Sequence, residues 1–400
     1  MKYDIVIVGA GPAGLSTGMH LTQLAPDLAG RTVILEQAHH PRPKLCAGGV
    51  TPGGEAWLRK LGLDFHQVPG VEVNEAHFLF EGEGFIVRHS PYVFRIIRRD
   101  EFDAWLAEAA RQRGLQIQEG VQVRRVHPLP TSDGNGFEVQ TDQGAWPARV
   151  VVGADGANSI VRRAVVDRGN RADHPSQVAR LLEVLLPDDG CSPVSIAGSA
   201  GTLPLTLEGD GRRVVIDFSW ITTGVQGYVW DFPTCVRNQP MHTRGIYDSR
   251  LHSHLPVSSL RQALAEALAQ ANGQLNPTAL QGHPLRWFSP GGVFSAPGIL
   301  LVGDAAGVGP LLGEGISFAL GYGDVAARQI QRAFQTGDFS FRYYRRAILQ
   351  HRIGRYMGRR HATAWLLYAI RMPLVLRMLS RYFGPLIRWF SKQFLVDWGE

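Results

Sequence analysis

The chain opens with a short apolar run that ends in glycines and is followed by a second such run. Residues 4–8 and 32–36 are rich in β-branched side chains, and residues 15–24 between them have a helical composition with several small residues. Continuous β-branched runs of this length are typical of buried parallel strands. The pattern therefore predicts a strand–helix–strand unit with a glycine-rich turn after the first strand.

That turn has the spacing of a dinucleotide-binding fingerprint. Gly9, Gly11 and Gly14 form a G-x-G-x-x-G arrangement, and Glu36 follows 22 residues after Gly14. Such glycines let the backbone approach a pyrophosphate, and the helix N-terminus offers it free N–H groups and a positive dipole end. The acid at the end of the second strand is placed to accept from a ribose hydroxyl. We expect a dinucleotide here, and the alternative is a tight structural turn.

The middle of the chain alternates between apolar and polar positions. A period of two, typical of antiparallel strands, runs through four stretches: residues 78–87, 121–126, 214–220 and 227–232. Residues 260–271 have the pattern of an amphipathic helix, and the Asp-Gly-Asn-Gly run at 133–136 predicts a hairpin turn. Because no low-complexity linker separates these stretches from the first unit, we expect the second domain to be inserted into the first.

Composition narrows the class of protein. With 44% hydrophobic and 19% charged residues, the chain can form a core and is too polar for a polytopic membrane protein. Cys46, Cys191 and Cys235 have no paired spacing, so a disulfide scaffold and a zinc ribbon are excluded and no metal site is expected. A reducing, cytoplasmic compartment follows. The first predicted strand begins too early to leave room for a signal peptide.

Basic residues gather at the C-terminal end. Residues 340–400 hold 12 Lys/Arg and two acids, in a chain with 41 Lys/Arg and 35 Asp/Glu in total. Arginines interrupt every apolar stretch there, so no uncharged run nears the ~20 residues of a membrane crossing. Arg377, Arg381 and Arg388 would share one helix face beside Trp389, which is typical of a helix in an anionic headgroup layer. The alternative is a helical cap with a solvated basic face; without a recognisable module, no nucleic-acid partner is expected.

Two further strand-like runs end in glycine and acid. Residues 150–153 lead into Ala154-Asp155-Gly156, followed by Ser159 and Arg162, and residues 298–302 lead into Gly303-Asp304-Ala305-Ala306. With the N-terminal glycines in front of them, these segments resemble the three fingerprints of the FAD-dependent oxidoreductases of the aromatic-hydroxylase type. The resemblance covers about residues 1–335 and implies FAD as the cofactor.

The resemblance also implies roles for single residues. Asp304 would contact the ribitol and pyrophosphate region, and a helix beginning near Gly315 would aim its N-terminus at the flavin pyrimidine. Arg99 matches the family arginine near FAD, and an ordinary surface salt bridge is the alternative for it. The expected cofactor-binding residues are Gly9, Gly11, Pro12, Ala13, Gly14, Glu36, Gln37, Lys44, Cys46, Arg99, Val123, Asp155, Gly303, Asp304, Gly313, Gly315 and Ile316.

Two more segments resemble those of the geranylgeranyl reductases, which saturate isoprenoid double bonds. Residues 43–49, Pro-Lys-Leu-Cys-Ala-Gly-Gly, are similar to their K-x-C-G-G-G loop, with Ala47 in place of a glycine. Residues 227–233 are similar to their Y-x-W-x-F-P strand, and an insertion at 234–244 follows. The resemblance places this chain among reductases of polyprenyl lipids.

The expected reaction gives roles to three side chains. An unactivated alkene needs a hydride on one carbon and a proton on the other, in a dry apolar pocket with one positioned acid. Cys46 could supply or relay that proton, or it could be a small buried filler. Tyr228 and Trp230 are two residues apart and face one side of their strand, where they could form a flat wall or ordinary sheet core.

These inferences combine into one expected architecture and function. We expect an α/β protein: a Rossmann-like FAD-binding domain (1–75, 95–165, 295–338), an inserted antiparallel β-sheet substrate domain (76–94, 166–294) and a basic helical C-terminal extension (339–400). The expected activity is reduction of polyprenyl chains; a flavin monooxygenase acting on an aromatic molecule or protein side chain is the alternative, and a non-catalytic flavoprotein is a third reading. With no second dinucleotide fingerprint, electrons come from transiently docked NAD(P)H or a redox protein. The expected location is cytoplasmic, with peripheral attachment to the inner membrane face.

Overall fold

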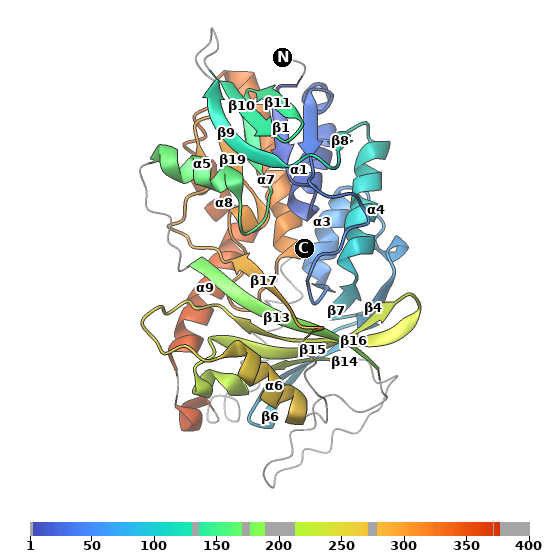
Figure 1. Cartoon of the computed structure of the whole chain (residues 1–400), viewed down its shortest axis with the longest axis vertical. Helices are drawn as coiled ribbons and strands as arrows, with labels where there is room; N and C mark the ends of the chain where they lie inside the picture. The colour runs from blue at the N-terminus through green and yellow to red at the C-terminus, as the bar shows by residue number, and fades with distance from the viewer. Residues whose placement is uncertain are drawn as a thin grey trace.

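The computed structural model describes most of the chain: residues 3–129, 136–169, 177–188, 213–270, 278–370 and 372–376. Two sheets dominate the molecule and lie at opposite ends of the view in Figure 1. The expected architecture is confirmed: a Rossmann-like parallel core, additional antiparallel sheets and C-terminal helices.

The parallel core is a six-stranded sheet near the top of Figure 1. All neighbours pair in parallel except the first two, in the order β18 (Ser295–Ala296), β19 (Ile299–Leu301), β12 (Val150–Gly153), β1 (Ile5–Val8), β2 (Thr32–Leu35) and β8 (Gln116–Gln118). The β1, β2 and β12 side chains are completely or almost completely buried, as the β-branched runs predict. The carboxyl ends of β1, β12 and β19 carry the three glycine-containing fingerprints.

Helices and a small sheet surround this core. The two helices that follow β1 and β19, α1 (Pro12–Leu24) and α7 (Ile316–Thr336), pack against each other, and α3 (Pro52–Lys60) and α4 (Arg99–Gln112) pack on them. A three-stranded antiparallel sheet packs against β1 and β12 and consists of β9 (Val123–Leu129), β10 (Gly136–Thr141) and β11 (Gly144–Ala148). The remaining helices of this part are α2 (Pro26–Ala29) and α5 (Ile160–Gly169).

The second large sheet has seven strands from two distant parts of the chain. Its order is β17 (Gln281–Arg286), β13 (Val178–Pro187), β16 (Gln239–Asp248), β15 (Gly227–Val236), β14 (Arg213–Asp217), β5 (Glu75–Phe80) and β6 (Glu83–Arg88), antiparallel except between β14 and β5. Helix α6 (Leu260–Gln270) covers one face, where Val184, Val229 and Ile246 meet Leu264. The opposite face is free to line a cavity. A second three-stranded sheet, of β3 (Gly49–Val50), β7 (Phe94–Ile97) and β4 (Gly70–Val73), lies beside it.

The predicted helical extension packs against α7, beside the parallel core, and against Phe80 of the seven-stranded sheet. It consists of α8 (Tyr344–Gln350) and α9 (Arg352–Ala369), and α9 runs along one side of the molecule in Figure 1. Tyr344, Arg360 and Tyr368 are completely buried. No helix among the described residues is long and apolar enough to cross a bilayer. Arg377, Arg381, Arg388 and Trp389 lie outside the described residues.

Some sequence-predicted elements differ in detail. Residues 78–87 are a hairpin rather than one strand, because Glu81 and Gly82 have positive φ and make a tight turn between β5 and β6. Strand β14 ends at Asp217, whose carboxylate accepts from the Ser219 N–H at 2.9 Å and starts a 3₁₀ helix, Ser219–Thr223. The predicted strand at 121–126 begins at Val123 and belongs to the three-stranded sheet. The turn predicted at 133–136 lies mostly outside the described residues.

Candidate functional site

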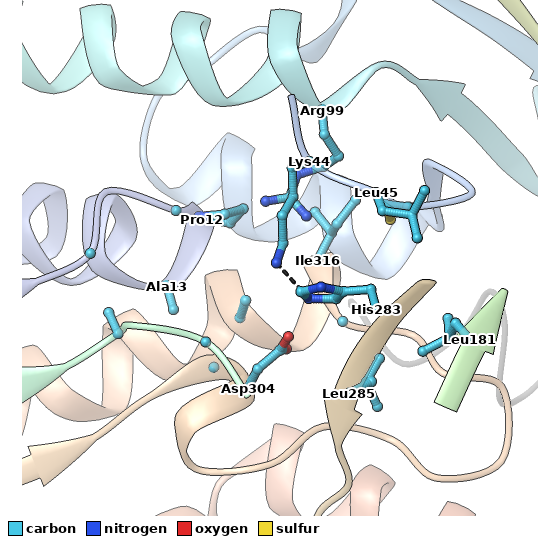
Figure 2. A pocket seen from close by; sticks show the side chains of 18 of the residues that line it. Pro12, Ala13, Lys44, Leu45, Arg99, Leu181, His283, Leu285, Asp304 and Ile316 are labelled. Atoms are coloured by element: carbon cyan, nitrogen blue, oxygen red, sulfur yellow. Dashed lines mark hydrogen bonds between the residues drawn. The ribbon is translucent and has the colours of Figure 1, made fainter. Parts of the chain in front are cut away.

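A cavity of about 480 Å³ opens between the carboxyl ends of the parallel strands and the inner face of the seven-stranded sheet. Figure 2 shows the two sides, with Pro12, Ala13 and Asp304 facing Leu181, His283 and Leu285. Sixteen of the seventeen expected cofactor-binding residues line this cavity, all except Gly14, and so do Tyr228 and Trp230. The structure thus brings the three fingerprints and both reductase-like segments to one place.

The dinucleotide turn is built for close approach. Gly9 has φ +103° and lies so near Ala154 that a Cβ would meet its carbonyl oxygen at 2.5 Å. A Cβ on Gly14 would overlap the carbonyl oxygen of Gly9, so this position requires glycine although Gly14 itself does not line the cavity. The first turn of α1 has no side-chain cap, so its N–H groups remain available to an anion.

Glu36 lies at the end of β2, as the fingerprint predicts, and its carboxylate is fixed by the backbone. It accepts from the N–H of Ala10 at 2.8 Å and from that of Ala38 at 3.1 Å. Arg42, which the sequence did not single out, lies between this carboxylate and that of Asp103, at 3.5 and 3.2 Å. The carboxylate is therefore held in place at the cavity rim by an arginine only six residues away in sequence.

A basic cluster occupies the centre of the cavity. Lys44 Nζ lies 2.6 Å from His283 Nε2, and both side chains come close to Asp304 in Figure 2. Burial, together with the charges of Lys44 and Arg99, lowers the pKa of His283 to about 4. A protonated Lys44 has only donors, so neutral His283 accepts at Nε2 and carries its proton on Nδ1.

Burial and the neighbouring positive charges act in opposite directions on the pKa of Asp304. Burial raises the pKa of its carboxyl, while Lys44 and Arg99 lower it. Lys44 itself has a pKa lowered by burial, with Asp304 acting against that shift. Around Asp304 the cavity therefore combines a carboxyl group with the cationic side chains of Lys44 and Arg99, an arrangement that suits a ligand carrying both hydroxyl and phosphate groups.

Arg99 is part of a buried pair rather than a surface salt bridge. Its guanidinium donates to both carboxylate oxygens of Asp103 at 2.8 Å, Asp103 is completely buried, and the Arg99 side chain is 10% exposed. Arg99 also lowers the pKa of Cys46. The pair holds a fixed positive charge at the cavity wall, beside the thiol.

Cys46 lies on the loop between β2 and β3 and lines the cavity. Its Sγ accepts from the N–H of Gly48 at 3.4 Å, and its side chain is partly exposed to the cavity. Burial raises the pKa of the thiol, and Arg99 and the Gly48 N–H offset only part of that increase. The group therefore stays a protonated thiol at neutral pH, which is the state a proton donor requires.

An aromatic wall faces this loop. As predicted, Tyr228 and Trp230 share the inner face of β15, together with Phe232, while Val229 packs on the other face against α6. The ring centroids of Tyr228 and Trp230 are 6.3 Å apart. Tyr228 donates its hydroxyl proton to the carbonyl of Leu312. The ring is thereby held against the segment that leads into α7.

That segment contains a buried acid that the sequence did not reveal. Glu314 lies between Gly313 and Gly315, directly before α7, and accepts from the Thr51 hydroxyl at 3.0 Å. Arg360 of α9 is completely buried, pairs with the other carboxylate oxygen, and stacks over Phe318 at 4.8 Å. The C-terminal helix is thus attached directly to the loop at the cavity.

The residues present fit FAD. Two helices, α1 and α7, begin at the cavity without side-chain caps, the glycine turn leaves no room for a side chain, and Glu36 and Asp304 stand where hydroxyl groups are expected. The sequence pattern of the FAD binding domain also matches residues 2–196. The protein is an FAD-dependent oxidoreductase.

Individual relatives refine this class. The chain is 27% identical over 354 residues to digeranylgeranylglycerophospholipid reductase 2 of Methanopyrus kandleri, covering 86% of this chain and 81% of the relative. Its fold is similar to that of a geranylgeranyl bacteriochlorophyll reductase-like protein of Thermoplasma acidophilum, with TM-score 0.73, 20% identity and coverage of 94% and 90%. It is also similar in fold to a mutant of the halogenase PltM in complex with FAD, with TM-score 0.63, 16% identity and coverage of 92% and 76%. The resemblance to the geranylgeranyl reductases is confirmed.

Proposed function

We propose that this protein saturates carbon–carbon double bonds of polyprenyl lipids of the geranylgeranyl type, by hydride transfer from flavin N5. The observation that carries the proposal is the arrangement of the cavity: a protonated thiol, Cys46, faces an apolar wall of Tyr228, Trp230 and Phe232. The name of the Methanopyrus relative supports the same substrate class.

The chain's own residues would bind the cofactor, balance its charge and donate the proton. Bound FAD, once reduced by an external donor, supplies a hydride. The Gly9–Gly14 turn, Glu36 and Asp304 would hold the cofactor, and Lys44 and Arg99 would balance its negative charge. Cys46 Sγ–H donates the proton to the second alkene carbon, because no carbonyl is present for the protein to polarise.

The aromatic wall determines which substrates fit. Tyr228 and Trp230 are 7% and 2% exposed, and Leu181 and Leu285 extend the apolar surface beside them. Such a surface excludes water from the alkene and binds flat hydrocarbon segments by burial alone, without a hydrogen bond that would select a polar group. An isoprenoid chain has this chemistry.

Product mass tests the proposal. Reduced protein is incubated without oxygen with a digeranylgeranylglycerophospholipid, and the lipid is analysed by mass spectrometry. A gain of two hydrogens per event is expected. An unchanged lipid contradicts the proposal. A gain of one oxygen by an aromatic acceptor, in a separate aerobic reaction with NADPH, would instead establish the monooxygenase alternative.

We also infer that the outer side of α9 contacts an anionic membrane surface. Its exposed side carries Arg355 and Arg359 in the first half and Trp365 and Leu366, 55% and 61% exposed, in the second. Met372 and Leu374, just beyond the helix, are exposed as well and extend this apolar surface. Basic residues beside exposed aromatic and aliphatic ones are typical of a helix in the headgroup layer.

Co-sedimentation with vesicles tests this contact. Each basic residue near an anionic surface contributes ~1 kcal/mol, so the double variant Arg355→Glu, Arg359→Glu is expected to bind anionic vesicles at least ~10-fold more weakly than wild type. The matched control, Arg124→Glu with Arg125→Glu on β9, is expected to bind like wild type. Equal binding of the two double variants, or wild-type protein that ignores anionic vesicles at low salt, contradicts the contact.

A further inference from the structure

A buried glutamate lies on the inner face of the seven-stranded sheet, outside the roles described so far. Glu183 of β13 is two residues from Leu181, so both side chains point toward the cavity side of the sheet. Its neighbours in register are Gly245 on β16 and Gln281 on β17. Figure 2 shows Leu181 at the cavity near His283, its partner in the register of β13 and β17. Glu183 is the next residue of β13 on the same face.

Gly245 brings this carboxyl group close to the aromatic wall. Trp230 pairs with Gly245 from the opposite strand, and its indole ring lies so near that a Cβ on Gly245 would overlap the ring. Because Gly245 has no side chain, no atom of β16 separates the inner-face space above Glu183 from the indole. Glu183 and Trp230 therefore adjoin one another across a single glycine.

Hydrogen bonds connect the same residues but leave one carboxyl oxygen free. Trp230 Nε1–H donates to Thr243 Oγ1 at 3.5 Å, and Thr243 hydrogen bonds to Glu183. Glu183 Oε2 has no hydrogen-bond partner among the described residues, although the side chain is only 5% exposed. A buried carboxyl oxygen without a partner is costly. It is far less costly when the group carries its proton.

The charges around Glu183 favour that neutral form. Burial raises the pKa of Glu183 to about 7, and only the Thr243 hydrogen bond and the charge of Arg98 act in the other direction. The charge of Glu183 in turn raises the pKa of Cys46, so the carboxyl group acts electrostatically on the thiol. A carboxylic acid is thus stored near the thiol that loses a proton in each turnover.

We propose that Glu183 is a proton-relay residue that returns a proton to Cys46 after each reduction. This inference rests on the proposed function. Reduced FAD supplies the hydride; as the Cys46 S–H bond breaks, a C–H bond forms and the electron pair stays on sulfur. The Glu183 O–H bond then breaks and the S–H bond forms again. The Glu183 carboxylate takes its next proton from water, so each cycle adds one hydride and one proton to the alkene.

A comparison of first and later turnovers tests the relay. The FAD-loaded protein is reduced with dithionite and mixed with a digeranylgeranylglycerophospholipid, and flavin oxidation is followed for one turnover and then at steady state with excess dithionite. Glu183→Gln keeps the shape and removes the acid. Its first turnover is expected within about twofold of wild type, because Cys46 already carries a proton. Its steady-state kcat is expected to fall ~10²-fold, the lower end of the range for a lost proton-transfer group, with KM unchanged.

The pH dependence provides a second readout. Glu183 has its proton only below its pKa, so wild-type kcat is expected to fall as pH rises through about 7, whereas the low kcat of Glu183→Gln stays flat there. Thr243→Val removes a hydrogen bond that lowers the pKa of Glu183, so the fall is expected at higher pH. The control Glu266→Gln, on the exposed side of α6, is expected to behave like wild type.

Three results would contradict a proton relay through Glu183. Glu183→Gln with wild-type kcat and the wild-type pH profile shows that Glu183 transfers no proton. A variant slowed equally in the first and later turnovers shows a structural role in holding Thr243 and Trp230. Wild-type protein that leaves the prenyl chain unreduced overturns the proposed function and this inference with it, whereas the first two outcomes overturn the inference alone.

Discussion

The two walls of the cavity are built by different means. On the side of the parallel sheet, the wall combines backbone at strand ends, helix N-termini and glycines with a small set of charged side chains that includes Glu36, Lys44 and Asp304. On the side of the seven-stranded sheet, the wall consists of side chains that alternate along β13, β15 and β17. Backbone geometry is fixed by the fold and suits a constant ligand, while side chains can be exchanged to suit different substrates.

The largest expected effect comes from adding one carbon to the backbone wall. In Gly14→Ala the new Cβ overlaps the carbonyl oxygen of Gly9, so the first turn of α1 must move away from the cofactor site. We expect the purified protein to lose its bound FAD, measured as flavin absorbance per protein after gel filtration. In the control, Gly358→Ala on α9, no atom lies within 4 Å of the added carbon, and full FAD content is expected. Retention of FAD in both variants would contradict the backbone-built wall.

A side chain at the junction of the walls is expected to affect rate but not cofactor binding. Cys46→Ala removes the proposed acid, and we expect kcat to fall ~10²–10⁴-fold with FAD content unchanged. Steady-state reduction of the prenyl lipid provides the measurement. Cys235→Ala, on the far part of β15, serves as control and should keep wild-type kcat. Full activity of Cys46→Ala removes the thiol from the mechanism.

The buried ion pair behind the backbone wall is expected to contribute to stability. Arg360→Met leaves Glu314 buried without its charged partner, and breaking such a pair costs ~3–5 kcal/mol in the free energy of unfolding. Denaturant unfolding of the FAD-loaded protein measures the loss. The adjacent exposed residue gives the control, Arg359→Met, for which a change below ~0.5 kcal/mol is expected. Equal stability of the two variants would show that α9 does not hold the Glu314 loop.

The side-chain wall is expected to make stability depend on pH. Between pH 4.5 and about 7 the unfolded chain ionises Glu183 while the folded chain keeps it protonated, so raising the pH favours unfolding. The loss amounts to about 3 kcal/mol and is complete above pH 7. Glu183→Gln is expected to abolish this component, measured as the difference between wild-type and variant unfolding free energies at pH 5 and pH 8. A constant difference across that range contradicts a buried, protonated Glu183.

The same contrast explains what the sequence could predict. The backbone wall is encoded by local spacing, so Gly9, Asp155 and Asp304, which the motifs single out, all lie at the cavity. His283 and Glu314 were missed because their partners, Lys44 and Arg360, are 239 and 46 residues away in sequence. No local pattern encodes such pairs. Glu183 was missed for the same reason, since only the register of β13 against β16 shows that it lies on the inner face of the sheet next to Gly245.

The packing of α9 fixes an orientation as well as a position. Arg360 and Tyr368 on its inner side bond to Glu314 and to the carbonyl of Leu311, in the segment that leads to α7. Trp365, whose ring also contacts His252, and Leu366 are 55% and 61% exposed. A protein tethered by a loose chain keeps its rotational freedom, whereas one bound through a packed helix does not. Any surface that binds the outer side of α9 therefore also sets the tilt of the cavity relative to that surface.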